Sequence, residues 1–238
     1  MIGTIINIIT VLLGGMVGNL LGSRLPERLK QTIIAGLGIF TLAYGLQMFF
    51  KTQNALVVLG SLLLGSLAGE WLRIEDRLQS LGGILERRFT KVQVDGSPSG
   101  SSRFIRGFLT ASLVFCVGPM TILGSIQDGL TGDHNLLIVK SILDGFAALA
   151  FSSSLGIGVL FSALVILFYQ GGLSLLAVQV QALVTSAMMT EMTAVGGLIL
   201  VAIALSSLLE IKKIRAGNFL PALLFAPVIV VIIAVLNR

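Results

Sequence analysis

Long apolar runs separated by short charged stretches constrain this chain more than any other feature. A run of about 20 mainly apolar residues is long enough to cross the roughly 30 Å hydrocarbon core of a membrane as an α-helix. Asp, Glu, Lys and Arg make up only 11% of the 238 residues, whereas a soluble domain carries about 25%. We therefore predict an all-α polytopic membrane protein and exclude a water-soluble enzyme or a nucleic-acid-binding protein.

Eight segments are long and apolar enough to be predicted as spans. They are residues 2–22, 32–50, 55–72, 104–123, 136–153, 156–170, 195–209 and 219–235. The total falls to seven if the fifth and sixth spans form one broken hairpin. Residues 173–190 carry no formal charge but contain Gln179 and Gln181. We predict that this segment is either a further span or a re-entrant segment.

A polar insert at residues 73–103 divides the chain into a first three-span unit, 1–72, and a second transmembrane unit, 104–238. Apolar residues at helical spacing predict an amphipathic surface helix inside this insert. These residues are Leu78, Leu81, Ile84 and Leu85. The Gly- and Ser-rich residues 96–102 predict a flexible linker.

The positions of Lys and Arg predict the orientation of the spans, because cytoplasmic connections carry an excess of both. Basic clusters at 24–30, 73–106 and 212–215 should be cytoplasmic, and the loop-like stretch 124–135, which lacks Lys and Arg, should face outward. Both chain ends then lie outside, provided that residues 173–190 do not cross completely. Three spans before the insert and three after it run in opposite senses, so we predict a three-plus-three inverted repeat followed by C-terminal helices.

Small residues recur every four positions on the first and third predicted spans. The two ridges are Gly14, Gly18 and Gly22 on the first span, and Ser61, Gly65 and Gly69 on the third. Such small-xxx-small ridges let two helix backbones approach closely. We expect spans one and three to pack on each other through these ridges. The alternative is that a ridge forms the face of a homo-oligomer, with a dimer favoured.

Two ionisable residues in the fifth span are the main candidates for function, because charges inside a membrane are costly. Lys140 and Asp144 lie four residues apart, so they share a helix face and can pair. Ser141 lies one residue from that face. One interpretation is a fixed ion pair that stabilises the bundle. The other is a relay in which Lys140 is the internal counter-charge and Asp144 is a gated carboxylate for a cation or proton.

Five further polar residues complete the candidate pathway for an ion or solute: Gln127, Asp128, Asp133, Gln170 and Asn7. In an outward loop, Asp128 and Asp133 would be either simply solvated or part of a vestibule that concentrates cations. Asp133 also has the position of an ordinary helix cap. Gln170 and Asn7 are weaker candidates, because amide side chains often bridge membrane helices.

The chain lacks the residues that common catalytic and metal sites need. It has one cysteine, Cys116, and one histidine, His134, so an internal disulfide and a multi-histidine metal site are excluded. The sequence patterns of zinc proteases, serine hydrolases and P-loop ATPases are also missing. We therefore expect no enzyme activity, no cofactor, no metal and no nucleic-acid partner.

Several short strings along almost the whole chain are distinctive. They are G-T…N…G-G within residues 3–15, G-S-I-Q-D-G-L-T-G-D at 124–133, K-S at 140–141, L-D-G at 143–145, G-I-G-V at 156–159, Q-G at 170–171 and N-F-L-P-A-L at 218–223. Together they resemble the YdfK/YqgA-type bacterial membrane proteins, also called domain of unknown function 554. The resemblance implies an integral plasma-membrane protein of prokaryotes, in contact with lipid, and it implies no particular substrate.

The leading functional hypothesis is a membrane transport protein, either a channel or a secondary transporter, for a small ion. A cation is favoured because Asp128, Asp133 and Asp144 outnumber Lys140 along the proposed path. An alternative is a transporter of a small polar organic solute or anion, which Lys140 and backbone amides would bind. A hypothesis of another class is a non-transporting scaffold or sensor that holds partners through residues 73–103.

Overall fold

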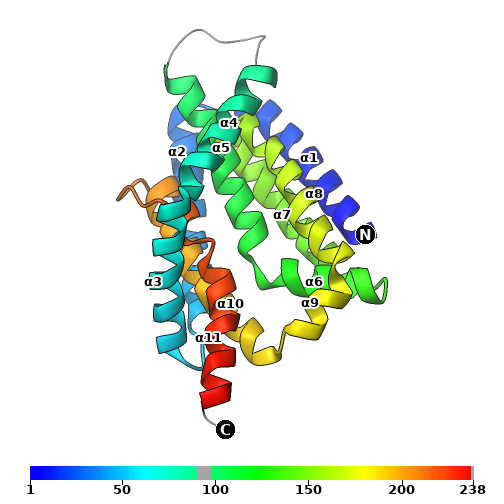
Figure 1. The fold of residues 1–238 in the computed structure, drawn as a ribbon. Coiled ribbons are helices and arrows are strands. Elements are labelled where there is room, and N and C mark those ends of the chain that lie inside the picture. Colours follow the sequence, from blue (N-terminus) through cyan, green and yellow to red (C-terminus); the bar gives the residue numbers. More distant parts are fainter. Residues whose placement is uncertain (90–97, 237–238) are drawn as a thin grey trace.

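The computed structural model describes residues 1–89 and 98–236, and within these ranges all regular secondary structure is helical. Figure 1 shows the helices gathered into one elongated bundle. Among the described residues, seven helices are long and apolar enough to cross a membrane, and there are eight if one bent helix pair counts as a span. The predicted fold class, an all-α polytopic membrane protein, is therefore confirmed.

The helices follow one another with short connections. They are α1 (Ile2–Gly22), α2 (Glu27–Phe49), α3 (Ala55–Leu72), α4 (Ile74–Phe89), α5 (Pro98–Val117), α6 (Pro119–Leu130), α7 (Asn135–Leu155), η1 (Ile157–Phe161), α8 (Ser162–Leu175), α9 (Ala177–Leu183), α10 (Ser186–Ile203), η2 (Ala204–Leu208), η3 (Ala216–Phe219) and α11 (Ala222–Leu236). Residues 173–190 thus contain the end of α8, the short helix α9 and the start of α10.

The fourth predicted span is bent within its length, as Gly118 and Pro119 predict, and the loop-like stretch after it needs correction. The apolar helix α5 ends at Val117, and α6 leaves it at an angle of 62°. Pro119 has no backbone N–H to continue α5, but it fits the first turn of α6. The stretch 124–135 is helical as far as Leu130, so the prediction of a loop is wrong there. Gly129 serves close packing rather than a turn, because a Cβ atom would overlap the carbonyl oxygen of Ser174.

The small-residue ridge of α1 packs against α7. A Cβ atom on Gly14 or Gly18 would overlap the carbonyl oxygen of Gly145 or Leu149, respectively. Because the later glycine of α1 meets the later residue of α7, the two helices run parallel. The expectation that spans one and three pack on each other is therefore wrong.

The ridge of α3 packs in the same way against the C-terminal part of the chain. A Cβ atom on Gly65 would overlap Ala222, and one on Gly69 would overlap the carbonyl oxygen of Asn218. Both ridges are thus filled by helices of the same chain. A homo-oligomer stays a prediction, and it would need another surface.

Helix α10 lies at the centre of the largest apolar core. Val195, Ile199 and Ile203 on this helix are completely buried, and α2, α5 and α11 supply their neighbours. The helix pairs α1–α7, α2–α10 and α3–α11 dominate the packing. This pairing does not confirm the three-plus-three inverted repeat, which stays a prediction.

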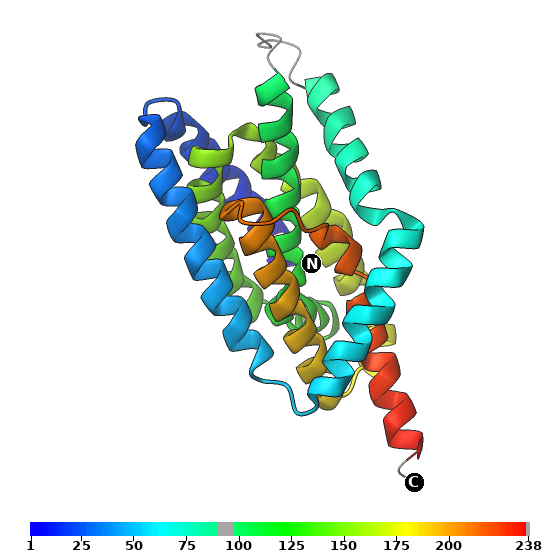
Figure 2. The same ribbon diagram turned by 90° about the vertical axis from the view of Figure 1, so that its left-hand side faces the viewer.

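The polar insert contains the amphipathic helix that the spacing predicts. Leu78 and Leu85 of α4 pack on the cluster around Phe108 of α5, whereas Leu81 and Ile84 are exposed. The linker prediction is wrong for residues 98–102, which belong to α5, while residues 96–97 lie outside the described ranges. Figure 2 shows α4 along the outside of the bundle, continuing from the end of α3.

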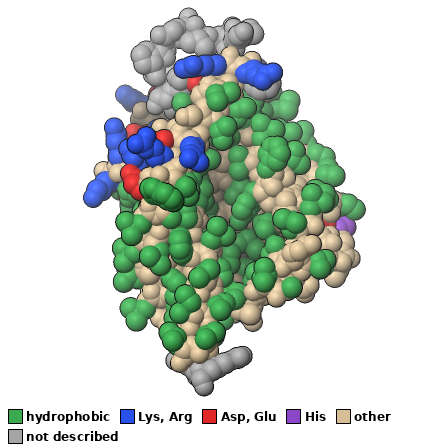
Figure 3. All heavy atoms as spheres, in the orientation of Figure 1, with side chains coloured by type: hydrophobic (Ala, Val, Ile, Leu, Met, Phe, Trp, Pro, Cys, Tyr) green, Lys and Arg blue, Asp and Glu red, His purple; other side chains and the backbone are tan. Residues whose placement is uncertain are grey.

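Contacts hold the three basic clusters at one end of the bundle. The Nε atom of Arg103 donates to the carbonyl oxygen of Ser154 at 3.0 Å, and the Ser154 hydroxyl donates to the carbonyl oxygen of Lys30 at 3.5 Å. Arg106 pairs with Glu210, close to residues 212–215. Figure 3 shows Lys and Arg at the upper end of this face, and α11 ends at the opposite end in Figure 1.

The α1–α7 contact yields a stability prediction. Replacing Gly18 with Ala should lower the free energy of unfolding by about 1–3 kcal/mol, because the methyl group has no space against Leu149. Gly36 on α2 is the matched control, since nothing lies within 4 Å of its Cβ position. Gly36→Ala should be neutral or stabilising by up to about 1 kcal/mol. Denaturant titration in detergent measures both values, and equal effects would contradict the packing argument.

Candidate functional site

Three helices bring four of the predicted pathway residues into one hydrogen-bonded network. Asn7 of α1 donates through Nδ2 to Asp144 Oδ2 on α7 at 3.0 Å and to Gln170 Oε1 on α8 at 2.9 Å. Lys140 donates to the same oxygen of Asp144. Gln170 Nε2 donates to the hydroxyl of Thr4 at 3.2 Å. We call these five residues the polar network.

The polar network lies in the interior of the bundle. Thr4, Asn7 and Gln170 are completely buried, while Lys140 and Asp144 retain 5% and 9% of their exposure. Asp144 is near the middle of α7, at the depth where a charge in a membrane costs most. The parallel contact between α1 and α7 places Asn7 beside Asp144, so the amide hydrogen bond partly offsets the cost of burying the carboxylate.

One polar atom of the network has no partner among the described residues. The Nδ2 group of Asn7 uses both of its hydrogens, but its Oδ1 atom is buried and accepts no hydrogen bond. Buried polar atoms are normally paired, so each exception needs an explanation. This oxygen is a free acceptor beside the Lys140–Asp144 pair, suited to water or a cation.

Asp128 lies near the network rather than in an outward loop. It is buried on α6, and its Oδ2 atom is 3.0 Å from the amino group of Met1. The expectation that Asp128 is solvated is therefore wrong, because α6 is a helix that packs this side chain inward. Met1 and Thr4 are one turn apart on α1, so polar groups extend along α1 from Asp128 to Asp144.

The other three predicted residues lie outside the polar network. The Ser141 hydroxyl donates to the carbonyl oxygen of Leu137 in its own helix at 2.6 Å. Asp133 is exposed and accepts from the backbone N–H of Asn135, the first residue of α7, at 3.1 Å. This hydrogen bond closes a local turn just before α7, whose N-cap residue is His134, so Asp133 is a solvated residue beside the helix start rather than its cap. Gln127 lies on another face of α6, away from Asp128.

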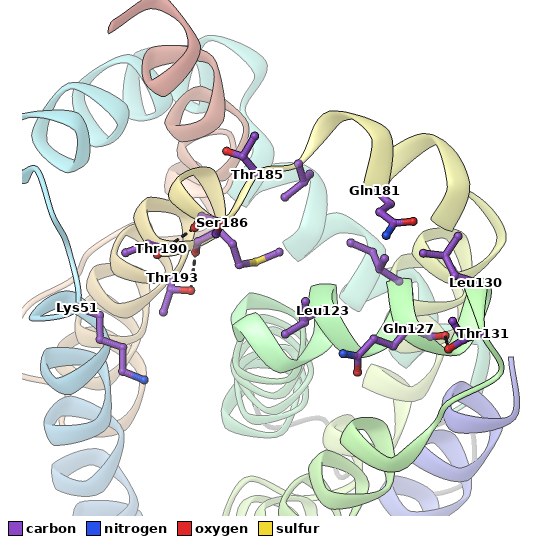
Figure 4. Close-up of a pocket in the computed structure, with 13 residues that line it drawn as sticks. Lys51, Leu123, Gln127, Leu130, Thr131, Gln181, Thr185, Ser186, Thr190 and Thr193 are labelled. Atoms are coloured by element: carbon purple, nitrogen blue, oxygen red, sulfur yellow. Dashed lines mark hydrogen bonds between the residues drawn. The ribbon is translucent and has the colours of Figure 1, made fainter. Parts of the chain in front are cut away.

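A cavity of about 650 Å³ lies between α6, α9 and α10. Its polar lining consists of Lys51, Gln127, Thr131, Gln181, Thr185, Ser186, Thr190 and Thr193. In Figure 4, the side chains of Lys51 and Gln127 extend toward the same gap from opposite sides. The cavity is lined neither by Lys140 nor by Asp144. Helix α6 contributes Gln127 to this lining, whereas Asp128 is not part of it.

Thr4 and Glu191 are two of the buried polar residues that sequence reasoning did not single out. Thr4 completes the polar network, but a lone threonine in an apolar run carries no specific signal. Glu191 of α10 is buried and accepts hydrogen bonds from the backbone N–H groups of Gln53 and Asn54 at 2.9 and 3.1 Å. It anchors the α2–α3 connection. Glu191 is the one acidic residue of α10, so the rule that identified Asp144 could have found it.

In residues 1–89 and 98–236, no three His, Cys, Asp or Glu side chains come close enough together to hold a metal ion. The chemistry available in the polar network is instead that of one carboxylate, one ammonium group, two amides and a hydroxyl.

The Lys140–Asp144 pair yields a prediction that is independent of function. Lys140→Met should lower the free energy of unfolding by about 3–5 kcal/mol, because it leaves a buried carboxylate without its counter-charge. Removing both charges in Lys140→Met/Asp144→Leu should recover much of this loss. The pair of Lys30 and Glu27, in which the carboxylate is exposed to solvent, serves as the control and should contribute less than about 1 kcal/mol. Denaturant titration of the single and double variants tests this, and additive losses would contradict it.

The comparisons with known proteins cover almost the whole chain. A family model described as "Protein of unknown function (DUF554)" matches residues 2–231. "Uncharacterized protein YqgA" of Escherichia coli (strain K12) is 36% identical over 225 residues, which cover 94% of each chain. "Uncharacterized membrane protein YdfK" of Bacillus subtilis (strain 168) is 28% identical over 237 residues, which cover 98% of this chain and 97% of that one. No solved structure matches significantly. The chain therefore belongs to the DUF554 family.

Proposed function

We propose that this protein transports a small cation or proton across the membrane, with the polar network as its internal binding site. The observation that carries the proposal is the Asp144 carboxylate. It lies in the middle of a membrane helix and accepts hydrogen bonds from Lys140 and Asn7. An ionisable group at this depth marks an ion pathway by default. In this scheme the ammonium group of Lys140 stays paired with the Asp144 carboxylate until an incoming cation or proton displaces it.

The unpaired Oδ1 atom of Asn7 supports this exchange. It provides a second oxygen beside Asp144 at which a dehydrated cation or a proton-carrying water could be held. A fixed structural pair needs no such free acceptor, and well-packed apolar residues would stabilise the bundle as well or better. The arrangement therefore favours a site that changes its occupant.

The shape of α6 supports gated transport rather than a continuously open pore. Lys140 and Asp144 are almost completely buried, so this conformation is closed at the pair. The bend at Gly118 and Pro119 joins α6 to α5, and α6 both lines the cavity and packs on α7 and α8, which carry the polar network. Broken helices of this kind form substrate sites in secondary transporters. In our proposal, a movement of α6 about this bend connects the cavity to the network.

The proposed orientation follows the basic clusters. We propose that their end of the bundle, with residues 73–103, faces the cytoplasm of a prokaryotic cell and that both chain ends face outward. The contacts among Lys30, Arg103 and Ser154 support a common side for these clusters. The cavity between α6, α9 and α10 would then open outward.

Ion flux into proteoliposomes tests the transport proposal. Vesicles containing the wild-type chain should dissipate an imposed gradient of H⁺, Na⁺ or K⁺. Asp144→Asn and Lys140→Met should reduce this flux to the leak of empty vesicles, because the exchangeable pair is lost.

The matched control is Glu191→Gln, which neutralises a buried carboxylate on a membrane helix outside the polar network. Its flux should resemble that of the wild type. Wild-type flux in well-folded Asp144→Asn would contradict the proposal. If the wild type moves none of the three cations and partners are recovered through residues 73–103, a scaffold or sensor is favoured instead.

A further inference from the structure

The junction of α3 and α4 forms a groove with mixed apolar and basic character at the basic end of the bundle. It has a volume of about 540 Å³, and we name it the Trp71 groove. The residues that define its chemistry are Trp71, Arg73, Asp76, Arg77, Leu81 and Ile84. Trp71 is 84% exposed and lies in the last turn of α3, a helix long and apolar enough to cross a membrane. Exposed tryptophan at such a position is typical of the boundary between lipid tails and headgroups.

The charges of the Trp71 groove favour an anion. Arg73 and Arg77 form no ion pair with any described carboxylate, so both guanidinium groups are available. The neighbouring Glu75 is occupied on the bundle side, where its Oε2 atom accepts from the backbone N–H of Gly217 at 2.8 Å. Asp76 remains in the groove, which leaves a net charge of one positive. Guanidinium groups suit phosphate because they can donate two parallel hydrogen bonds.

The backbone at Arg73 indicates that its side chain has a role. Arg73 ends α3 with φ 50° and ψ 49°, in the left-handed region. Glycine adopts this conformation without steric cost and is the usual residue at such a helix end. An arginine that accepts backbone strain at this position is expected to contribute through its guanidinium group.

The apolar part of the groove fits a lipid tail rather than a soluble anion. Leu64, Leu67 and Trp71 share one exposed face of α3, which leads away from the two arginines along the membrane helix. Leu81 and Ile84 of α4 are exposed beside them. We propose that the Trp71 groove binds one anionic phospholipid, with its phosphate on Arg73 and Arg77 and an acyl chain along α3.

The single tryptophan of the chain provides the test, because Trp71 is its own fluorescent probe. The wild-type protein is placed in two vesicle preparations of identical composition, mainly phosphatidylcholine with a minority of phosphatidylglycerol. Bromine, which quenches tryptophan at short range, is carried by the acyl chains of only one lipid in each preparation. Quenching per mole of phosphatidylglycerol should exceed that of phosphatidylcholine about fivefold, the preference that one net basic charge supplies near anionic lipid.

Two variants and one control make the result specific. Arg73→Gly and Arg77→Gln should each lower the preference for phosphatidylglycerol, and Arg73→Gly should not lower thermal stability because it relieves the left-handed strain. Arg24→Gln removes a charge from the predicted cytoplasmic loop between α1 and α2 and should leave the preference unchanged. Equal quenching by both lipids in the wild type would overturn the proposal. The proposal would also be overturned if Arg24→Gln lowered the preference for phosphatidylglycerol as much as the two groove variants do. Loss of that preference when soluble glycerol phosphate is added would overturn it as well.

Discussion

The close parallel contact between α1 and α7 is the constraint on which the candidate site depends. Gly14 and Gly18 leave no side chain between the two backbones, so α1 lies directly on Gly145 and Leu149. This proximity lets the amide of Asn7 reach Asp144 and Gln170 together. In a membrane, apolar burial does not drive helices together, and small residues with interhelical hydrogen bonds take over that role. The same pair of helices, α1 and α7, therefore provides both the close backbone packing and the hydrogen bond to Asp144.

Each buried charge in the described bundle is compensated in a different way. Asp144 has an ammonium group and an amide, Glu191 has two backbone N–H groups and a hydroxyl, and Asp128 has the amino group of Met1. Only the Asp144 site contains two amides, a second charge and an unpaired oxygen. This surplus of polar groups over structural need is the reason why we propose it as a binding site, whereas Glu191 is explained by anchoring a loop.

Local rules account for most of the predicted elements and for part of the site. Length and apolarity located the spans, and the four-residue spacing of Lys140 and Asp144 predicted their pairing, because both depend only on helical periodicity. The same rules were wrong at residues 124–130, a glycine-containing stretch that was predicted to be loop-like and is helical. Glycine permits a turn and a close helix contact equally well, and only the neighbouring Ser174 shows which of the two applies.

The sequence by itself determined a multi-span helical membrane protein, an amphipathic α4, and a lysine–aspartate pair inside one span, since each follows from composition or from spacing along one helix. Only the tertiary structure decided that the ridge of α1 packs on α7 rather than on α3, that Asp128 faces inward, and that Asn7 and Gln170 join Asp144. The two hydrogen bonds of Asn7, for example, join residues 137 and 163 positions apart. Periodicity shows which face of a helix is small or polar, but it carries no information about which other helix meets that face.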